Sequence, residues 1–308
     1  MSEVILDIRN MNVALGPHLA VKDVNYQIHA GEILGVVGES GCGKSLTSLA
    51  IMGLLDNKLN LSGEILFQGE NLVGMSEAHY QRVRGEGIGM IFQEPMTALN
   101  PVVTVGEQVA EMFLVHENVS KAEAMNRAIE MFKQVHIPFA EKRAKAYPHE
   151  LSGGMRQRVM IAMALACKPK VLIADEPTTA LDVTVQAQVL DLLEELRETT
   201  GTAIQFISHS LGVVSQISDR VMVMYAGQVV ELADVNDIFD NPQHPYTQAL
   251  LDTIPRVGVD IERLPAIPGS VPPLDQRGEN YTFRDRCPDL FNHYQQVAKE
   301  RNLGIRSK

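Results

Sequence analysis

Residues 38–45 combine three glycines with a final lysine–serine pair in a spacing that suits phosphate binding. They read Gly-Glu-Ser-Gly-Cys-Gly-Lys-Ser and fit the pattern G-x-x-x-x-G-K-[ST]. Glycines let the backbone curl so that successive N–H groups point at phosphate oxygens, and a following helix adds the partial positive charge of its N-terminus. We expect Lys44 to bind the β- and γ-phosphates of a nucleotide and the Ser45 hydroxyl to bind Mg²⁺. The expected nucleotide-binding residues of this loop are Gly38, Glu39, Ser40, Gly41, Cys42, Gly43, Lys44 and Ser45.

The segments on either side of this phosphate loop are those that the pattern requires. Residues 33–37 are an apolar run typical of a buried strand, and residues 46–52 form a helical pattern without a breaker. A glycine-rich turn that fits the pattern by chance is the alternative. Strand, loop and helix in succession favour the phosphate site.

An acidic pair follows a second apolar run. Residues 171–174 predict a buried strand, and Asp175 and Glu176 stand at its end. Asp175 can hold Mg²⁺, directly or through water, and Glu176 can orient and deprotonate a water that attacks the γ-phosphate. The alternative is an exposed carboxylate pair that opens a turn at Pro177. The phosphate loop upstream favours a functional pair.

A second anion site is expected around residues 151–155, which read Leu-Ser-Gly-Gly-Met. A serine and two glycines before a helical stretch place backbone donors at a helix N-terminus. The alternative is a structural helix start with Ser152 as its N-cap. Two phosphate-seeking helix starts in one chain favour the functional interpretation.

Composition restricts the class of protein. The chain has 308 residues, 45% of them hydrophobic, and a formal net charge of −11. That charge argues against electrostatic binding of nucleic acid. No apolar run is long enough to span a bilayer, no secretory signal is evident, and three distant cysteines suit a reducing compartment. We expect a cytosolic protein.

The order of the patterns predicts an α/β fold. Short β segments at 4–8, 21–26 and 63–67 suggest an antiparallel sheet, and a further strand is expected at 88–93. Residues 105–165 have helical periodicity, with a capping box starting at Ser120. Strands then alternate with helices, which indicates a mostly parallel sheet. The expected elements of this last part are strands at 171–174, 203–207 and 221–225 and a helix at 183–199.

Taken together, these motifs resemble the ATP-binding subunits of ABC transporters over roughly residues 4–250. The resemblance implies a phosphate-loop NTPase fold with a parallel core sheet, an antiparallel β subdomain and a helical subdomain at about 95–165. It implies ATP and Mg²⁺ as cofactors and ATP hydrolysis as the activity. The roles carried over are Walker A for Lys44 and Ser45, Walker B for residues 171–175, catalytic glutamate for Glu176, Q-loop for Gln93, signature for Leu151, Ser152, Gly153, Gly154 and Met155, D-loop for Ala180, Leu181 and Asp182, and switch histidine for His209.

In this family two such domains face each other head to tail and sandwich ATP between the Walker motifs of one and the signature loop of the other. The resemblance therefore implies a second ATPase subunit, usually a paralogue, two membrane permease subunits and a substrate-binding protein. It places the chain peripherally on the cytoplasmic face of the inner membrane. It also implies catalytic roles for Glu176, His209 and Gln93 and Mg²⁺ ligation by Ser45, Gln93 and Asp175.

The C-terminal part, residues 241–308, resembles the extension of oligopeptide, dipeptide and nickel importer ATPases, after an ATP-binding domain at 1–240. The matching residues are 241–251 and 267–269, together with the phrase Phe-Gln-Glu-Pro at 92–95 and residues 99–101. Pro245 is expected to open a short helix that ends near Thr253. Relatives often have four cysteines here that resemble iron–sulfur ligands, but this chain has only Cys287 of that set. We expect no cluster.

Two further residues stand out. The aromatic side chain that stacks on adenine in this family is missing, and Leu15 occupies the expected position with His18 nearby. Cys42 lies in the phosphate loop at a helix start, where a thiol pKa tends to fall; a small inert loop residue is the alternative.

The function expected is that of an ATPase subunit of an importer, with di- or oligopeptides as cargo. Nickel, a metallophore or an oligosaccharide remain alternative cargoes. A soluble ABC ATPase that acts on ribosomes or DNA is a different class. Such proteins usually hold two ATP modules or a long coiled coil, whereas this chain has one module and roughly 110 residues between Lys44 and the signature loop.

Overall fold

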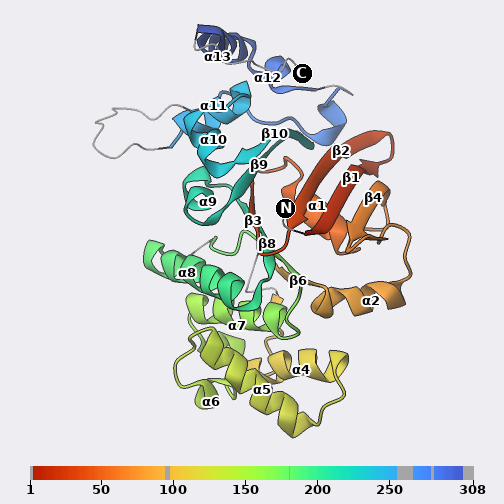
Figure 1. Cartoon of the computed structure of the whole chain (residues 1–308), viewed down its shortest axis with the longest axis vertical. Helices are drawn as coiled ribbons and strands as arrows, with labels where there is room; N and C mark the ends of the chain where they lie inside the picture. Colours follow the sequence, from red (N-terminus) through yellow and green to blue (C-terminus); the bar gives the residue numbers. More distant parts are fainter. Residues whose placement is uncertain (1–2, 94–97, 180, 255–265, 279–280, 301–308) are drawn as a thin grey trace. The chain divides into compact units, whose positions relative to one another are not determined.

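A computed structural model describes residues 3–93, 98–179, 181–254, 266–278 and 281–300. The chain forms two compact units. The first comprises Met1–Ile5, Ile28–Glu32 and Gly74–Gln205, and the second Leu6–Gln27, Ile33–Val73 and Phe206–Lys308. Figure 1 shows the elements of both units, which are described separately below.

An antiparallel sheet occupies much of the second unit. Its strands are β1 (Val4–Leu15), β2 (His18–His29), β4 (Leu59–Phe67) and β5 (Glu70–Asn71), in the order β2-β1-β4-β5. Strand β4 runs antiparallel to both β1 and β5. The predicted sheet is confirmed, but β1 and β2 have 12 residues each and are longer than expected. A register shift between Arg9 and Asn12 lets β1 continue past Asn10, which has a φ of 46°.

The strand before the phosphate loop, β3 (Ile33–Val37), is buried along its whole length, as its apolar sequence predicted. It pairs in parallel with β9 (Arg220–Tyr225), which pairs antiparallel with β10 (Gln228–Asp234). Helix α9 (Leu211–Ile217) packs on β3. A Cβ on Gly35 would lie 2.2 Å from the Val214 Cγ1 atom, so a glycine is needed for this close approach.

The C-terminal extension is helical and packs on the end of β9. It follows α10 (Val235–Asp240) and contains α11 (Pro245–Asp252), a 3₁₀ turn (Leu274–Gln276), α12 (Phe283–Arg286) and α13 (Pro288–Glu300). Tyr246 on α11 and Phe283 on α12 meet Tyr225 of β9, with ring centroids 4.6 and 5.6 Å away. All three rings are almost fully buried, so this aromatic cluster fixes the extension to the sheet. The helix expected to open at Pro245 is confirmed, and its C-cap is Thr253.

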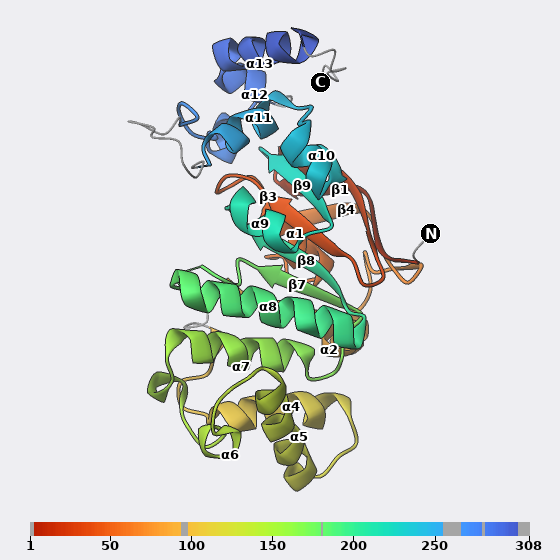
Figure 2. The same cartoon turned by 60° about the vertical axis from the view of Figure 1, so that its left-hand side comes forward.

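The first unit is mostly helical. Figures 1 and 2 show α4 (Val105–His116), α5 (Lys121–Gln134) and α7 (Gly153–Leu165) in mutual contact. Its strands β6 (Ile88–Ile91) and β7 (Val171–Asp175) pair in parallel. The remaining elements are α2 (Glu77–Glu86), α6 (Ala140–Arg143), a 3₁₀ turn (Pro148–Glu150) and α8 (Val183–Thr200), while the residues of β8 (Ala203–Ser208) are divided between the two units.

The local predictions for the first unit hold with two changes. Helix α8 covers the expected range, but β6 ends at Ile91, two residues before Gln93. At Ser120 the structure gives only half of the expected capping box, because the hydroxyl accepts from the Glu123 N–H while Glu123 pairs with Arg127. A full capping box is present instead at Thr104, before α4.

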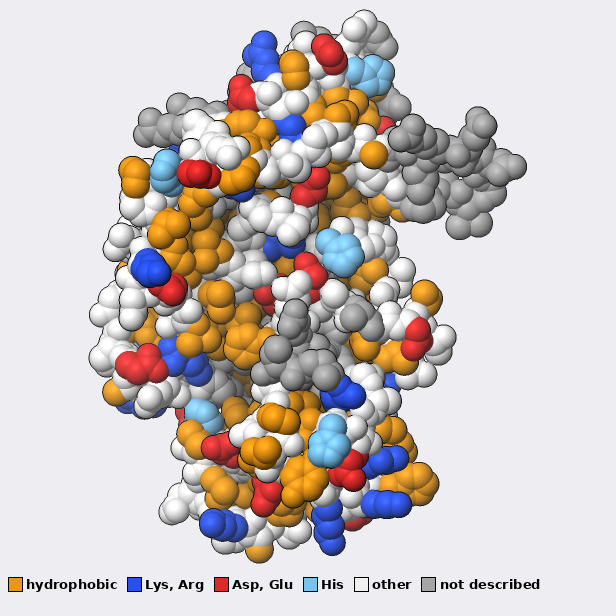
Figure 3. Space-filling model, turned by 180° about the vertical axis from the view of Figure 1, so that it is seen from behind, with side chains coloured by type: hydrophobic (Ala, Val, Ile, Leu, Met, Phe, Trp, Pro, Cys, Tyr) orange, Lys and Arg blue, Asp and Glu red, His pale blue; other side chains and the backbone are white. Residues whose placement is uncertain are grey.

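Among the described residues, no helix is both long and apolar enough to cross a membrane. On the face drawn in Figure 3, acidic and basic side chains are interspersed over the described part of the chain.

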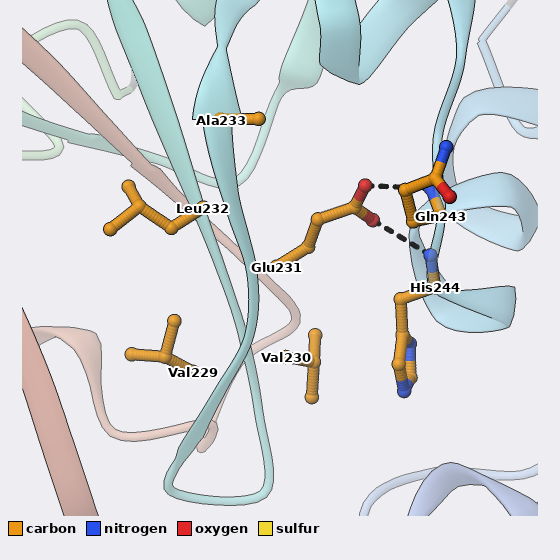
Figure 4. Close-up of a pocket in the computed structure, with 7 residues that line it drawn as sticks. All are labelled: Val229, Val230, Glu231, Leu232, Ala233, Gln243 and His244. Atoms are coloured by element: carbon orange, nitrogen blue, oxygen red, sulfur yellow. Dashed lines mark hydrogen bonds between the residues drawn. The ribbon is translucent and has the colours of Figure 1, made fainter. Parts of the chain in front are cut away.

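The start of α11 contains a histidine whose ionisation opposes folding. Glu231 of β10 accepts hydrogen bonds from the Gln243 and His244 N–H groups at 2.6 and 3.0 Å (Figure 4). The His244 Nδ1 atom accepts from the Tyr246 N–H at 3.1 Å and so caps the helix. Burial lowers the pKa of His244 to about 4. The folded chain therefore keeps this imidazole neutral where an unfolded chain would protonate it.

We expect the free energy of unfolding to decrease as the pH falls from about 6.5 to 4, because the unfolded chain gains the proton first. The lowered pKa corresponds to about 2–3 kcal/mol over this window. His244→Asn keeps a capping acceptor but does not titrate, so urea unfolding at several pH values should show a flatter profile for this variant. The exposed His149, replaced by Asn, is the control. Parallel profiles for His244→Asn and the unmodified chain would contradict the prediction.

Candidate active site

The phosphate loop (residues 38–45) joins β3 to helix α1 (Lys44–Ile51) in the second unit. Gly38, Gly41 and Gly43 have φ values of 154°, 76° and 102°, a range that other residues rarely adopt. A Cβ on Gly38 would lie 2.3 Å from the Met224 carbonyl oxygen. The glycines of the motif are thus required both by backbone conformation and by close packing against β9.

Lys44 curls back over this loop. Its side chain is buried, and the Nζ atom donates to the carbonyl oxygens of Gly38 and Glu39 at 2.7 and 3.2 Å. The N-cap of α1 is Gly43, which offers no side-chain acceptor to the first N–H groups of the helix. An ammonium group and uncapped helix donors at one loop suit a bound phosphate chain. Ser45, the expected Mg²⁺ ligand, lies in the first turn of this helix.

The Cys42 thiol does not have the lowered pKa that its position at a helix start would suggest. The side chain is fully buried, and burial raises the pKa of its thiol against the opposing effect of the Lys44 charge. The expected lowering of this pKa is therefore wrong, because desolvation outweighs the positive charge nearby. The interpretation of Cys42 as a small packing residue of the loop accords with this burial.

A cluster of polar side chains ties the phosphate loop to the C-terminal extension. The Arg286 guanidinium of α12 donates to both carboxylate oxygens of Glu39, at 2.5 and 3.1 Å. It also donates to the carbonyl oxygens of Pro268 and Gly269. The Tyr246 hydroxyl accepts from the Glu39 N–H at 3.1 Å and donates to its carboxylate at 3.3 Å. The Arg286 side chain is 3% exposed, so the pair is shielded from solvent on that side.

In the first unit, the structure brings Gln93 and Glu176 together. Asp175 is the buried last residue of β7, and Glu176 follows it with a φ of 48°. A positive φ at a residue other than glycine costs conformational energy and is common at functional sites. The Glu176 carboxylate accepts from Gln93 Nε2 at 3.0 Å and from the Thr179 hydroxyl at 2.9 Å. These contacts hold the carboxylate at the end of β7 in one orientation.

The signature loop begins α7 as a donor-rich helix start. The Ser152 hydroxyl accepts from the Met155 N–H at 3.3 Å, so this serine is the N-cap, as the structural alternative proposed. Leu151 is buried, and its carbonyl oxygen accepts from Arg156 Nε at 3.0 Å. Ser152 and Gly153 are exposed. The cap therefore leaves the outer surface of the loop open, and a structural and a functional role are compatible here.

The two glycines of this loop differ in what surrounds them. A Cβ on Gly154 would lie 2.7 Å from Val185 Cγ1, whereas the nearest atom to a Cβ on Gly153 is Leu181 Cδ2 at 4.0 Å. We expect Gly154→Ala to lower the free energy of unfolding by about 1–3 kcal/mol, because α7 and α8 must shift apart. Gly153→Ala, the matched control, is expected to change it by less than about 0.5 kcal/mol. Urea unfolding of both variants is the measurement, and equal effects would contradict the packing argument.

The remaining predicted residues lie at the ends of strands and helices. The Asp182 carboxylate caps α8 by accepting from the Val185 N–H at 2.9 Å. His209 is exposed and directly follows β8, in the part of the chain that belongs to the second unit. Ala180 of the expected D-loop, and Glu94 and Pro95 of the importer phrase, lie outside the described residues.

Leu15 and Cys287 mark the two departures from the family pattern. Leu15 ends β1 and is 44% exposed. Cys287 is buried at the end of α12, and its Sγ atom donates to the Pro268 carbonyl oxygen at 3.5 Å. The expectation that no cluster is held here stays a prediction.

Comparison with known proteins decides the family. The model of the family "ABC transporter" matches residues 21–179, and that of "Oligopeptide/dipeptide transporter, C-terminal region" matches residues 230–292. The oligopeptide transport ATP-binding protein AppD of Bacillus subtilis is 53% identical over 90% of this chain and 85% of its own length. OppD of Escherichia coli is 48% identical over 93% of this chain and 86% of its own length. The chain belongs to the family of oligopeptide/dipeptide transporter ATP-binding subunits.

The fold of this ABC transporter ATP-binding subunit also matches solved ABC cassettes. A dimeric post-hydrolysis state of the ATP-binding cassette MJ0796, bound to ADP and Pi, has a TM-score of 0.67 and 29% identity, over 75% of this chain and 99% of the cassette. CbiO1 of Clostridium perfringens, part of an ABC transporter complex, has a TM-score of 0.68 and 30% identity, over 78% and 92% of the two chains. The predicted family and α/β ABC ATPase fold are thereby confirmed.

Proposed function

We propose that the chain is the ATP-hydrolysing subunit of an ABC importer for di- or oligopeptides. Identity of about one half to AppD and OppD carries the proposal, because it covers both the ATP-binding segment and the extension. Both relatives are described as oligopeptide transport ATP-binding proteins. Membrane permeases and a second ATPase are the partners that such a subunit requires.

Residues 38–45 would hold the phosphates of ATP. Their N–H groups surround the phosphate oxygens, Lys44 neutralises the β- and γ-phosphates, and the α1 N-terminus adds its partial charge. Ser45 of the second unit and Asp175 and Gln93 of the first are the ligands proposed for Mg²⁺, because their hydroxyl, carboxylate and amide oxygens are hard donors of the kind that this ion prefers. Bound there, Mg²⁺ would neutralise the negative charge on the phosphates.

Glu176 is the residue proposed to activate water. Its carboxylate would take a proton from the water as the oxygen bonds to the γ-phosphorus, while the bond to the ADP oxygen breaks. The contacts with Gln93 and Thr179 orient the carboxylate. His209 would contact the γ-phosphate. The signature loop and Asp182 would face the ATP bound by a second ATPase subunit.

The assembly proposed contains this chain, a second ATPase subunit that is a paralogue, two permease subunits and a substrate-binding protein that reaches the chain only through the permeases. The chain would lie peripherally on the cytoplasmic face of the inner membrane. The mixed charge on the face drawn in Figure 3 and the acidic balance of the sequence give no support to a nucleic-acid partner.

The test is isolation of the chain with its membrane partners, followed by reconstitution in lipid vesicles. We expect two permeases to co-purify in detergent, and a labelled di- or oligopeptide to be transported with the binding protein and ATP on opposite sides. Uptake of nickel or an oligosaccharide instead would contradict the peptide cargo. Association with ribosomes or DNA and no permease would contradict the transport function.

A further inference from the structure

A hollow of about 330 Å³ adjoins the phosphate loop in the second unit. Three segments that are distant in sequence line it: the turn between β1 and β2 with the start of β2, the turn between β9 and β10, and the C-terminal extension. Its lining includes His18, Leu19 and Lys22 from the first, Gln228 from the second, and Arg277 and Tyr281 from the extension.

Backbone contacts connect the walls of this hollow directly to the phosphate loop. The Gly227 N–H donates to the Cys42 carbonyl oxygen, and the Lys22 N–H donates to the Gly227 carbonyl oxygen, both at 2.9 Å. A Cβ on Gly43 would lie 3.3 Å from Val21 Cγ2. The β1–β2 and β9–β10 segments therefore lie against the loop, and a nucleotide with its phosphates on the loop has the hollow within reach.

The extension contributes the planar groups that face this hollow. Arg277 donates from Nη2 to the Gly41 carbonyl oxygen at 3.1 Å and from Nε to the Pro272 carbonyl oxygen at 2.7 Å. These two bonds hold the guanidinium plane in place at the edge of the loop. The Tyr281 ring stacks on Tyr225 with centroids 6.2 Å apart and an interplanar angle of 21°. Aromatic rings and fixed guanidinium planes are the groups on which nucleobases stack.

The β1–β2 turn itself lacks such a group. Its residues from Leu15 to Leu19 include no Phe, Tyr or Trp, and Leu15 lies at the end of β1. We propose that Tyr281 and Arg277 of the C-terminal extension hold the nucleobase in this hollow, in place of an aromatic residue of the turn. The proposal rests on the proposed function in one respect, namely that residues 38–45 hold the phosphates.

This arrangement makes the extension a part of the nucleotide site. Arg277 then contacts the loop and the base at once, so base binding and loop conformation depend on the same side chain. Tyr281 is partly exposed, so a purine that stacks on its ring would also remove apolar surface from water.

The test compares two ligands that share a triphosphate but differ in the base. The full chain is titrated with ATP and with inorganic tripolyphosphate, each with Mg²⁺, in an isothermal calorimeter. We expect Tyr281→Ala to weaken ATP binding by about 5- to 100-fold and to leave tripolyphosphate binding unchanged. Tyr281→Phe is expected to retain ATP affinity. The exposed Tyr147, replaced by Ala, controls for loss of a tyrosine elsewhere.

A second variant pair checks the guanidinium. Arg277→Ala is expected to weaken ATP binding more than tripolyphosphate binding, whereas Arg284→Ala, an exposed arginine of the same extension, should change neither. Unchanged ATP affinity in Tyr281→Ala would overturn the proposal, and so would an equal loss for both ligands, which would indicate an effect on the loop alone. If the unmodified chain bound neither ligand, the proposed function itself would fail, which is a separate result from the same titration.

Discussion

Glu176→Gln is expected to lower ATP hydrolysis by about 10²- to 10⁴-fold in the assembled complex, because the amide cannot accept the proton of the attacking water. Gln keeps the size of the side chain and one oxygen acceptor for Gln93 or Thr179. ATP binding should therefore persist, and the closed pair of ATPase subunits should accumulate. Turnover is measured by phosphate release, and closure by the amount of ATP retained after gel filtration.

Glu198→Gln is the matched control, since Glu198 is an exposed glutamate on α8. It should hydrolyse ATP at the unmodified rate. Turnover of Glu176→Gln within about threefold of the unmodified complex would reject Glu176 as the base. A variant that lost ATP binding as well would instead indicate that Glu176 holds the site together.

Arg286→Met is expected to lower the free energy of unfolding by about 2–3 kcal/mol, because it leaves the Glu39 carboxylate without its cationic partner. Glu39 is 30% exposed, which places the loss below that of a fully buried pair. The Tyr246 hydroxyl still donates to this carboxylate at 3.3 Å, but it is neutral and cannot replace the positive charge of Arg286. Because Glu39 is part of the phosphate loop, ATP affinity should fall in the same variant. Urea unfolding and calorimetry measure the two effects.

A double-mutant cycle with Glu39→Gln separates the ion pair from the other contacts of Arg286. We expect a coupling energy of about 1–3 kcal/mol between the two positions. Arg284→Met is the control, on the same short helix but exposed. A coupling energy near zero would mean that only the bonds to Pro268 and Gly269 matter, and that the loop does not depend on the ion pair.

Features defined by short, local patterns could be predicted from the sequence. The β3–loop–α1 unit, the strand before Asp175 and the helix that opens at Pro245 all lie where residue type and periodicity indicated. In each case the signal depends on neighbours in the chain: glycine conformations, an apolar run, or a proline at a helix start. Helix α2 was not predicted, because its sequence is polar and two residues inside it, Arg84 and Gly85, do not have helical backbone angles.

Contacts that depend on the tertiary fold could not be predicted from residue patterns alone, without the family resemblance. Gln93 and Glu176 are 83 residues apart, and only the pairing of β6 with β7 brings the ends of these strands together. No sequence pattern indicated that Thr179 contacts Glu176, although it lies only three residues beyond it. The sequence left two alternatives open for Cys42, because a helix start is visible in the sequence but burial is not. Arg277 and Arg286 are surface-like residues in sequence, and only the structure places both on the phosphate loop.

The Glu39–Arg286 ion pair joins two residues that the ribosome adds at widely separated times. The two residues are 247 positions apart. At synthesis rates of about 5–20 residues per second, Arg286 follows Glu39 by roughly 12 to 50 seconds. During that interval β3 and α1 can form, but the loop between them has neither Arg286 nor Arg277 as a partner. The newly made phosphate loop therefore reaches its final form only after the segment that contains Arg277 and Arg286 has been synthesised.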